Sequence, residues 1–159
     1  MKQKEILFVC SGNTCRSVIA EAFFQFEKEK LFPELPYQAY SAGINAIEGE
    51  HATREAIFSM AKYGIDVTTH RSRMVEGNIV AQSSYILTMT YQQLNLLKKS
   101  FPMDANKIFL MRPFCYQNDN IKNKEVEDPF GSNLYCYEKL CFQMQKDIKK
   151  LINYLRKGL

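Results

Sequence analysis

The feature that most constrains this chain is a short polar loop between an apolar strand and an amphipathic helix. Residues 6–9 (Ile-Leu-Phe-Val) have the continuous apolar pattern of a strand that is buried on both faces of a sheet. The loop, residues 10–17, follows directly, and a helical pattern then runs from residue 18 to about 30. Such a loop aims its backbone N–H groups and the positive end of the helix at one point. The sequence therefore predicts an anion-binding site after the first strand.

Two side chains of this loop can carry chemistry on a bound phosphate. Cys10 begins the loop and Arg16 stands near its end, with five residues between them. N–H groups that hold a phosphate dianion also favour a thiolate over a thiol, so Cys10 is a candidate nucleophile. Arg16 offers a planar pair of donors that matches two phosphate oxygens.

The rest of the chain alternates between predicted strands and helices. Strands are predicted at residues 5–10, 37–42, 84–89 and 107–111, and helices at 18–30, 52–62, 90–101 and 133–156. Thr90 and Gln93 have the spacing of a capping box at the start of the third helix. A polar loop at 117–127 leads to Asp128.

This alternation predicts an α/β fold, a three-layer sandwich with a central four-stranded parallel sheet flanked by helices. The phosphate-binding loop follows strand 1, and ligands of such sheets bind beyond the carboxyl ends of the strands. The chain contains no repeat, low-complexity stretch or linker, so residues 1–159 are predicted to form a single domain.

Composition and charge remove several classes of function. The net charge of +4 comes without a basic block interleaved with aromatic residues, so nucleic acid is not an expected partner. No stretch is long and apolar enough to cross a membrane, and the N-terminal apolar run is too short for a signal peptide. A monomer is expected.

Five cysteines spread along the chain do not suit a secreted disulfide framework, and the protein is expected in the reducing cytoplasm. The cysteines have no paired zinc-type spacing with His51 or His70, so neither a metal nor another cofactor is expected. His70 is interpreted as a loop or core residue that forms hydrogen bonds. Three further cysteines are interpreted as packed or half-packed side chains: Cys115, Cys136 and Cys141.

The loop sequence Cys10-Ser-Gly-Asn-Thr-Cys-Arg16-Ser17, with Asp128-Pro129 far downstream, resembles the low-molecular-weight protein tyrosine phosphatase family. The resemblance includes Ser41-Ala42-Gly43 and the chain length, and it covers nearly the whole sequence. One departure is Val18, where the family usually has a proline that pre-sets the first turn of the helix.

The resemblance implies a mechanism with a phosphocysteine intermediate. Cys10 would attack phosphorus in line, and Asp128 would protonate the leaving group and then activate the hydrolytic water. The phosphate oxygens would be held by the Arg16 side chain and the N–H groups of the loop residues Ser11, Gly12, Asn13, Thr14, Cys15 and Arg16. Ser17 would donate its hydroxyl to the Cys10 sulfur, and Asn13 would brace the loop, against Ser41.

Cys15 has two open interpretations. The resemblance implies that a second cysteine in the loop can trap an oxidised Cys10 as a disulfide. The alternative is that Cys15 is a small buried side chain that fills space.

Thr14 bears on the substrate. Tyrosine phosphatases of the family usually have isoleucine or leucine here, whereas the bacterial protein-arginine phosphatases have threonine. That branch also has Asp-Pro-Phe-Gly, as this chain does from Asp128 to Gly131. The motifs therefore favour phosphoarginine in protein substrates, with Asp128 pairing with the guanidinium and Phe130 stacking on it. Phosphotyrosine is the alternative substrate.

Two other functions share parts of this pattern. A thioredoxin-coupled arsenate reductase of this fold needs two further cysteines near the third strand and the helix after it, and residues 80–100 contain none. A non-catalytic phosphate-binding module would be expected to lack Cys10 or Asp128, and both are present.

Overall fold

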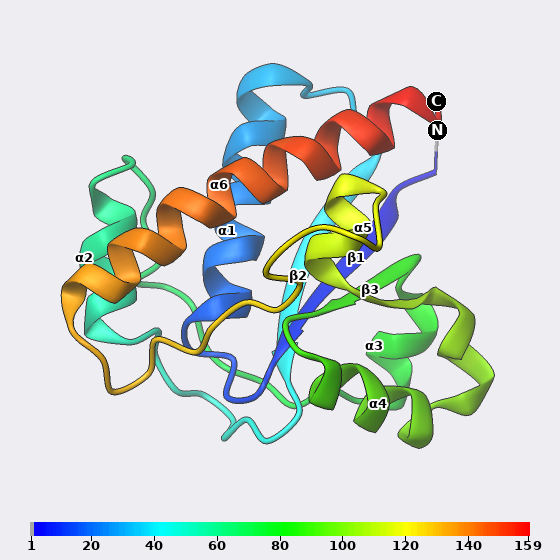
Figure 1. The fold of residues 1–159 in the computed structure, drawn as a ribbon, viewed down its shortest axis with the longest axis horizontal. Coiled ribbons are helices and arrows are strands. Elements are labelled where there is room, and N and C mark those ends of the chain that lie inside the picture. Colours follow the sequence, from blue (N-terminus) through cyan, green and yellow to red (C-terminus); the bar gives the residue numbers. More distant parts are fainter. Residues whose placement is uncertain (1) are drawn as a thin grey trace.

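A parallel four-stranded sheet forms the centre of the structure, a computed structural model that describes residues 2–159 (Figure 1). The strands are β1 (Lys4–Cys10), β2 (Tyr37–Gly43), β3 (Tyr85–Thr88) and β4 (Ile108–Leu110), in the order β2-β1-β3-β4. The side chains of residues 6–9 in β1 are completely buried, which explains their continuous apolar pattern. The predicted parallel sheet is confirmed.

Helices cover both faces of this sheet, and the alternating side chains of β1 face the two layers in turn. Ile6 and Phe8 belong to one apolar cluster, and Leu7 and Val9 belong to the other. The first cluster contains buried residues of α1 (Arg16–Leu31), α2 (Arg54–Ala61), α5 (Met111–Tyr116) and α6 (Leu134–Lys157). The second contains residues of α3 (Gly77–Gln82) and α4 (Tyr91–Ser100).

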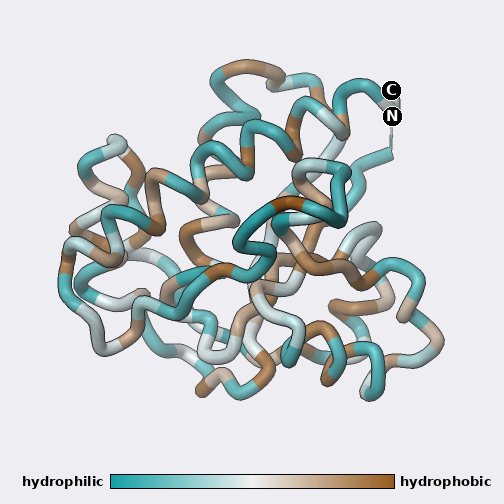
Figure 2. The backbone as a smooth tube through the Cα atoms, in the orientation of Figure 1, coloured by the Kyte–Doolittle hydropathy of each residue, from teal (hydrophilic) through white to brown (hydrophobic). Residues whose placement is uncertain are grey.

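The long helix α6 has one buried face along its length, and this makes its sequence pattern easy to interpret. In Figure 2 it alternates between hydrophobic and hydrophilic segments along its length, as expected of a helix with one buried face. Its buried positions include Tyr137, Met144 and Ile148. No helix among residues 2–159 combines the length and the apolar character that crossing a membrane requires.

Three short helical segments were not predicted: α3, α5 and the 3₁₀ helix η1 (Pro102–Lys107). Each has six residues, which is at most two turns and too short for a helical period to show in the sequence. α5 also begins at Met111, so the last predicted strand is shorter than the range 107–111.

The order of the strands places the loop after β1 at the point where the chain changes direction across the sheet. From β1 the chain passes to β2 on one side, and later returns to β3 on the other side of β1. Residues 117–133, which we call the crossing segment, link α5 to α6 on the carboxyl-end side of the sheet (Figure 1). Ligands of open α/β sheets bind at such a switch point.

Candidate active site

The loop from residue 10 to 17, called the phosphate loop below, is held by its carbonyl groups. Backbone N–H groups of residues 44, 45 and 53 donate to the carbonyls of Cys10, Ser11 and Thr14 at 2.9–3.0 Å. The N–H groups of Gly12, Thr14 and Cys15 have no protein acceptor among residues 2–159. The loop therefore directs its carbonyls into the fold and leaves donors available to an anion.

Gly43, the last residue of β2, allows the phosphate loop to approach the sheet. A Cβ at this position would lie 2.6 Å from the Ser11 carbonyl oxygen and 2.9 Å from the Asn13 nitrogen. Both atoms belong to the backbone and cannot move without displacing the loop. Glycine is therefore required at the end of the Ser41-Ala42-Gly43 segment.

Asn13 holds the loop in its curved shape. Its φ of 55° lies in the left-handed region, which asparagine tolerates better than most residues. The side-chain Nδ2 donates to Ser17 Oγ at 2.9 Å, and Oδ1 accepts the Arg73 N–H at 3.0 Å. The Asn13 carbonyl lies 2.7 Å from His70 Nε2. Burial lowers the pKa of His70, so the ring is neutral at pH 7, and its one N–H can be given to this carbonyl.

The prediction that Asn13 braces against Ser41 is wrong. The Ser41 hydroxyl donates to the carboxylate of Glu21 in α1, because Ser41 pairs with Phe8 in the sheet and faces the same layer. Burial raises the pKa of Glu21 above its ordinary value. Ser41 meets the loop only indirectly, since Arg73 Nε donates to the Ser41 carbonyl at 3.1 Å.

Cys10 is the first residue of the phosphate loop and is 1% exposed. Its sulfur is 3.0 Å from Ser17 Oγ and accepts the Asn13 N–H at 3.3 Å. Since Ser17 Oγ already accepts a hydrogen bond from Asn13, its own hydrogen is free to point at the sulfur. No side chain caps the N-terminus of α1 beside it. These donors and the positive end of α1 surround the sulfur with groups that can stabilise negative charge on it during a reaction.

Arg16 opens α1 with a buried side chain that reaches the crossing segment. Nη1 donates to the Val126 carbonyl at 3.0 Å, and Nη2 lies 3.5 Å from Asp128 Oδ2. Nε is buried and has no hydrogen-bond partner among residues 2–159. A buried donor without a partner is costly, so the Nε–Nη2 edge is the part of Arg16 available to two oxygens of an oxyanion.

Asp128 stands beside Arg16 and remains open to solvent, with 51% of its side chain exposed. Its Oδ1 accepts the Phe130 N–H at 3.0 Å, which fixes the carboxylate on the turn. The Phe130 side chain is 69% exposed and is free to contact a substrate. The sequence-predicted Asp128 thus lies next to the phosphate loop although more than a hundred residues separate them.

Cys15 and Thr14 complete the rim of the loop. The Cys15 thiol lies 3.9 Å from Asp128 Oδ1, and burial with the nearby Cys10 and Asp128 charges raises the Cys15 pKa to about 12. Cys15 is therefore a neutral thiol at pH 7. The Thr14 hydroxyl lies 3.7 Å from the position that a Cβ on Gly12 would take.

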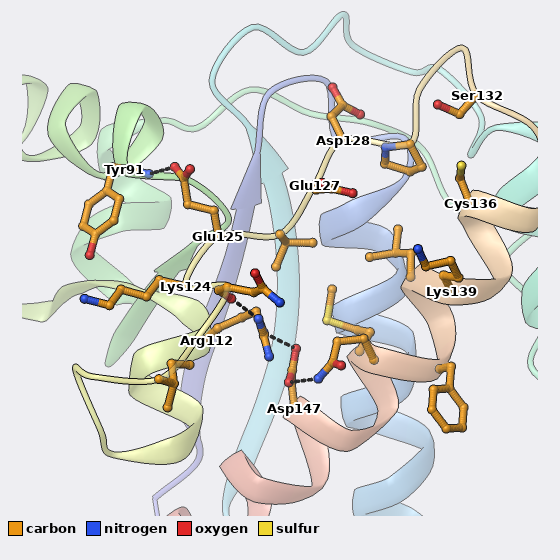
Figure 3. Close-up of a pocket in the computed structure, with 18 residues that line it drawn as sticks. Tyr91, Arg112, Lys124, Glu125, Glu127, Asp128, Ser132, Cys136, Lys139 and Asp147 are labelled. Carbon is orange, nitrogen blue, oxygen red and sulfur yellow. Dashed lines mark hydrogen bonds and ion pairs between the residues drawn. The ribbon is translucent and has the colours of Figure 1, made fainter.

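A cavity of about 870 Å³ lies between the crossing segment and α6, with Asp128 at one end (Figure 3). At its other end Arg112 Nε donates to Asp147 Oδ2 at 3.1 Å. Residues 10–17 do not line this cavity. No group of three or more metal-ligating side chains among residues 2–159 could hold a metal ion.

His70 forms hydrogen bonds as interpreted, but four contacts that support the site were not predicted from the sequence, and they involve His70, Arg73, Gln93 and Val126. In the contacts of His70, Arg73 and Val126, one of the two bonded atoms belongs to the backbone. Every residue has the same backbone groups, so such contacts leave no pattern in the sequence. Gln93 had a signal, since its capping-box spacing was recognised. Its hydrogen bond to Ser11 in the phosphate loop was not expected.

Comparison with known proteins adds independent findings. The family model described as low molecular weight phosphotyrosine protein phosphatase matches residues 5–159. The protein-arginine-phosphatase of Geobacillus stearothermophilus is 30% identical over 151 residues, which cover 95% of each chain. The crystal structure of a low molecular weight protein tyrosine phosphatase from T. tengcongensis is 33% identical, with a TM-score of 0.87 over 96% of this chain and 99% of that one. A structure of the YwlE arginine phosphatase, a mutant with a phosphorylated active-site serine, is 27% identical, with a TM-score of 0.89 over 96% of each chain.

Proposed function

This chain belongs to the low molecular weight phosphotyrosine protein phosphatase family, and we propose that it hydrolyses phosphoarginine in proteins through a phosphocysteine at Cys10. The observation that carries the proposal is the convergence of three groups at the carboxyl end of β1. These are the Cys10 sulfur, the Nε–Nη2 edge of Arg16, whose Nε has no partner among residues 2–159, and the Asp128 carboxyl group.

In the first step the Cys10 thiolate attacks phosphorus, forming a P–S bond as the P–N bond to the substrate guanidine breaks. The N–H groups of the phosphate loop and the Arg16 edge hold the three remaining oxygens, whose negative charge they stabilise. Asp128, in its protonated form, gives its proton to the departing nitrogen. Arg16 Nη2 lies beside Asp128 when no phosphate is bound, and it donates to a phosphate oxygen when the substrate binds.

In the second step the Asp128 carboxylate takes a proton from water as the water oxygen attacks phosphorus. The P–S bond breaks, its electron pair returns to Cys10 as a thiolate, and inorganic phosphate leaves. The contacts of the sulfur with Ser17 and the Asn13 N–H stabilise this thiolate as a leaving group. The phosphorylated active-site serine in the related arginine phosphatase mutant supports a covalent step of this kind.

Thr14 and Phe130 support the preference for phosphoarginine. The Thr14 hydroxyl can form a hydrogen bond with the phosphoryl group or with the hydrolytic water, which the isoleucine or leucine of the tyrosine phosphatases cannot do. The exposed Phe130 ring can stack on a guanidinium that Asp128 pairs with. The arginine phosphatase among the relatives supports the same preference.

Replacing Thr14 by isoleucine is expected to lower kcat/KM for phosphoarginine relative to phosphotyrosine by about tenfold or more, because it removes the hydroxyl and changes the shape of the rim. The measurement is a side-by-side kinetic comparison of the two substrates with wild type and variant. Thr14→Val is the matched control, since it removes the hydroxyl and keeps the shape.

If the ratio of kcat/KM for phosphoarginine to that for phosphotyrosine is unchanged in Thr14→Ile, Thr14 does not determine the substrate preference. A wild-type enzyme that prefers phosphotyrosine would instead support the alternative, a protein tyrosine phosphatase, which the relative from T. tengcongensis favours.

We also propose that residues 1–159 act as a single domain, as a monomer, in the cytoplasm on phosphorylated proteins. The match of the family model to residues 5–159 supports the domain assignment. The five cysteines are free thiols, which suits a reducing compartment. The absence of cysteines from residues 80–100 continues to disfavour arsenate reduction through a relay of thiols.

A further inference from the structure

Gln93 joins the two parts of the site although it lies outside both. It stands in the first turn of α4, in the capping box with Thr90, and only 3% of it is exposed. We propose that Gln93 is a positioning residue that sets the Ser11 hydroxyl as a donor to bound phosphate and links the phosphate loop to the crossing segment. The inference rests on the proposed function for its catalytic consequence, but its effect on anion binding is independent of turnover.

The orientation of the Gln93 amide follows from its neighbours. Oε1 accepts the N–H groups of Met89 and Thr90 at 2.9 and 3.2 Å. Two donors require an acceptor at this position, so the oxygen lies there and the NH₂ group points the other way. Nε2 then donates to Ser11 Oγ at 3.1 Å. The Ser11 hydroxyl accepts this bond and keeps its own hydrogen free.

The same residue connects Ser11 to Arg16 through a path of hydrogen bonds. Met89, whose N–H is bound to Gln93, accepts the Val126 N–H on its carbonyl at 2.9 Å. The Val126 carbonyl in turn accepts Arg16 Nη1 at 3.0 Å. One path of hydrogen bonds therefore connects the start of the phosphate loop with the end of the same loop. It passes through Met89, which follows β3, and through the crossing segment.

A second contact ties the same end of α4 to the crossing segment. The Tyr91 N–H donates to Glu125 Oε2 at 2.7 Å (Figure 3). Glu125 and Val126 lie just before Asp128 in the sequence. The position of the Asp128 carboxyl group therefore depends on both the Tyr91–Glu125 and the Met89–Val126 hydrogen bonds. Gln93 acts on the reacting groups through these neighbours and touches none of them.

Glutamate at position 93 separates the two roles of this side chain. Glutamine and glutamate both complete a capping box, so the start of α4 is preserved. A carboxylate cannot donate to Ser11, and it accepts the Ser11 hydrogen instead. It also places a negative charge near the loop that must bind a phosphate dianion. Helix capping therefore survives while anion binding is impaired.

The test is calorimetric titration of inorganic phosphate into wild type, Gln93→Glu and Gln92→Glu. Gln92 is the neighbouring exposed glutamine on the same helix, so it is the matched control. Phosphate binding is expected to weaken about tenfold in Gln93→Glu and to stay within about twofold of wild type in Gln92→Glu. The kcat/KM for phosphoarginine should fall at least as much in Gln93→Glu.

Phosphate affinity in Gln93→Glu equal to that in Gln92→Glu would overturn the proposal. Circular dichroism shows whether Gln93→Glu folds. If it does not, Ser11→Ala tests the same bond from the loop side, and unchanged phosphate binding by that folded variant would overturn the proposal too. Because calorimetry needs no turnover, a failure of the proposed function appears separately, as normal phosphate binding by a wild type that hydrolyses neither substrate.

Discussion

Replacing Cys10 by serine is expected to abolish turnover, by about 10⁴-fold or more, while inorganic phosphate still binds. A serine hydroxyl in this setting is not ionised at neutral pH and makes a far weaker nucleophile than the thiolate. The donors that hold the phosphate, the free N–H groups of the loop and the Arg16 edge, are unchanged by the substitution. A Cys10→Ser variant that loses turnover but still binds phosphate therefore identifies Cys10 as the nucleophile.

The measurement combines steady-state hydrolysis of an aryl phosphate with calorimetric titration of phosphate. Cys136→Ser makes the same change in a half-buried cysteine of α6, and we expect it to keep activity within about twofold. Sustained hydrolysis by Cys10→Ser would show that another group attacks phosphorus.

Replacing Asp128 by asparagine is expected to lower kcat/KM, which reports the first step, by about 10²–10⁴-fold with substrates that have a poor leaving group, and by about tenfold or less with those that have a good one. The amide keeps the size of the carboxyl group and can still meet Arg16, but it has no proton to give. A good leaving group departs without that proton, so its first step loses little. The comparison uses a series of aryl phosphates whose phenols differ in acidity.

Glu127→Gln provides the control, since it makes the same neutralising change in the adjacent exposed carboxylate. We expect this variant to follow wild type across the series. Equal losses for every leaving group in Asp128→Asn would exclude the acid role and leave Asp128 with a binding role only.

The fold and the places of Cys10 and Arg16 in it could be predicted because both depend on local pattern. Residues 6–9 are apolar without a break because both faces of β1 are covered, and the loop must follow where the strand ends. The distance between Asp128 and Arg16 has no such local cause. It depends on the path of the crossing segment, which backbone contacts to Met89 and Arg16 hold in place.

The Ser41 prediction failed for a related reason. Ser41 lies near the end of β2, close in sequence to Gly43, which does touch the loop. Its side chain follows the alternation of the strand and faces α1, where it meets Glu21. Sequence placed the strand correctly and gave no means of knowing which later residue would reach Asn13. That residue is Arg73, through its backbone N–H.

The central claim is that Cys10 carries the phosphoryl group, and peptide mass spectrometry after a rapid quench tests it most directly. Asp128→Asn turning over a substrate with a good leaving group should accumulate the intermediate, because hydrolysis of the P–S bond still needs the missing base. One phosphoryl group is expected on the peptide that contains Cys10. A peptide that carries the phosphoryl group on another residue, or turnover with no covalent species at all, would contradict it.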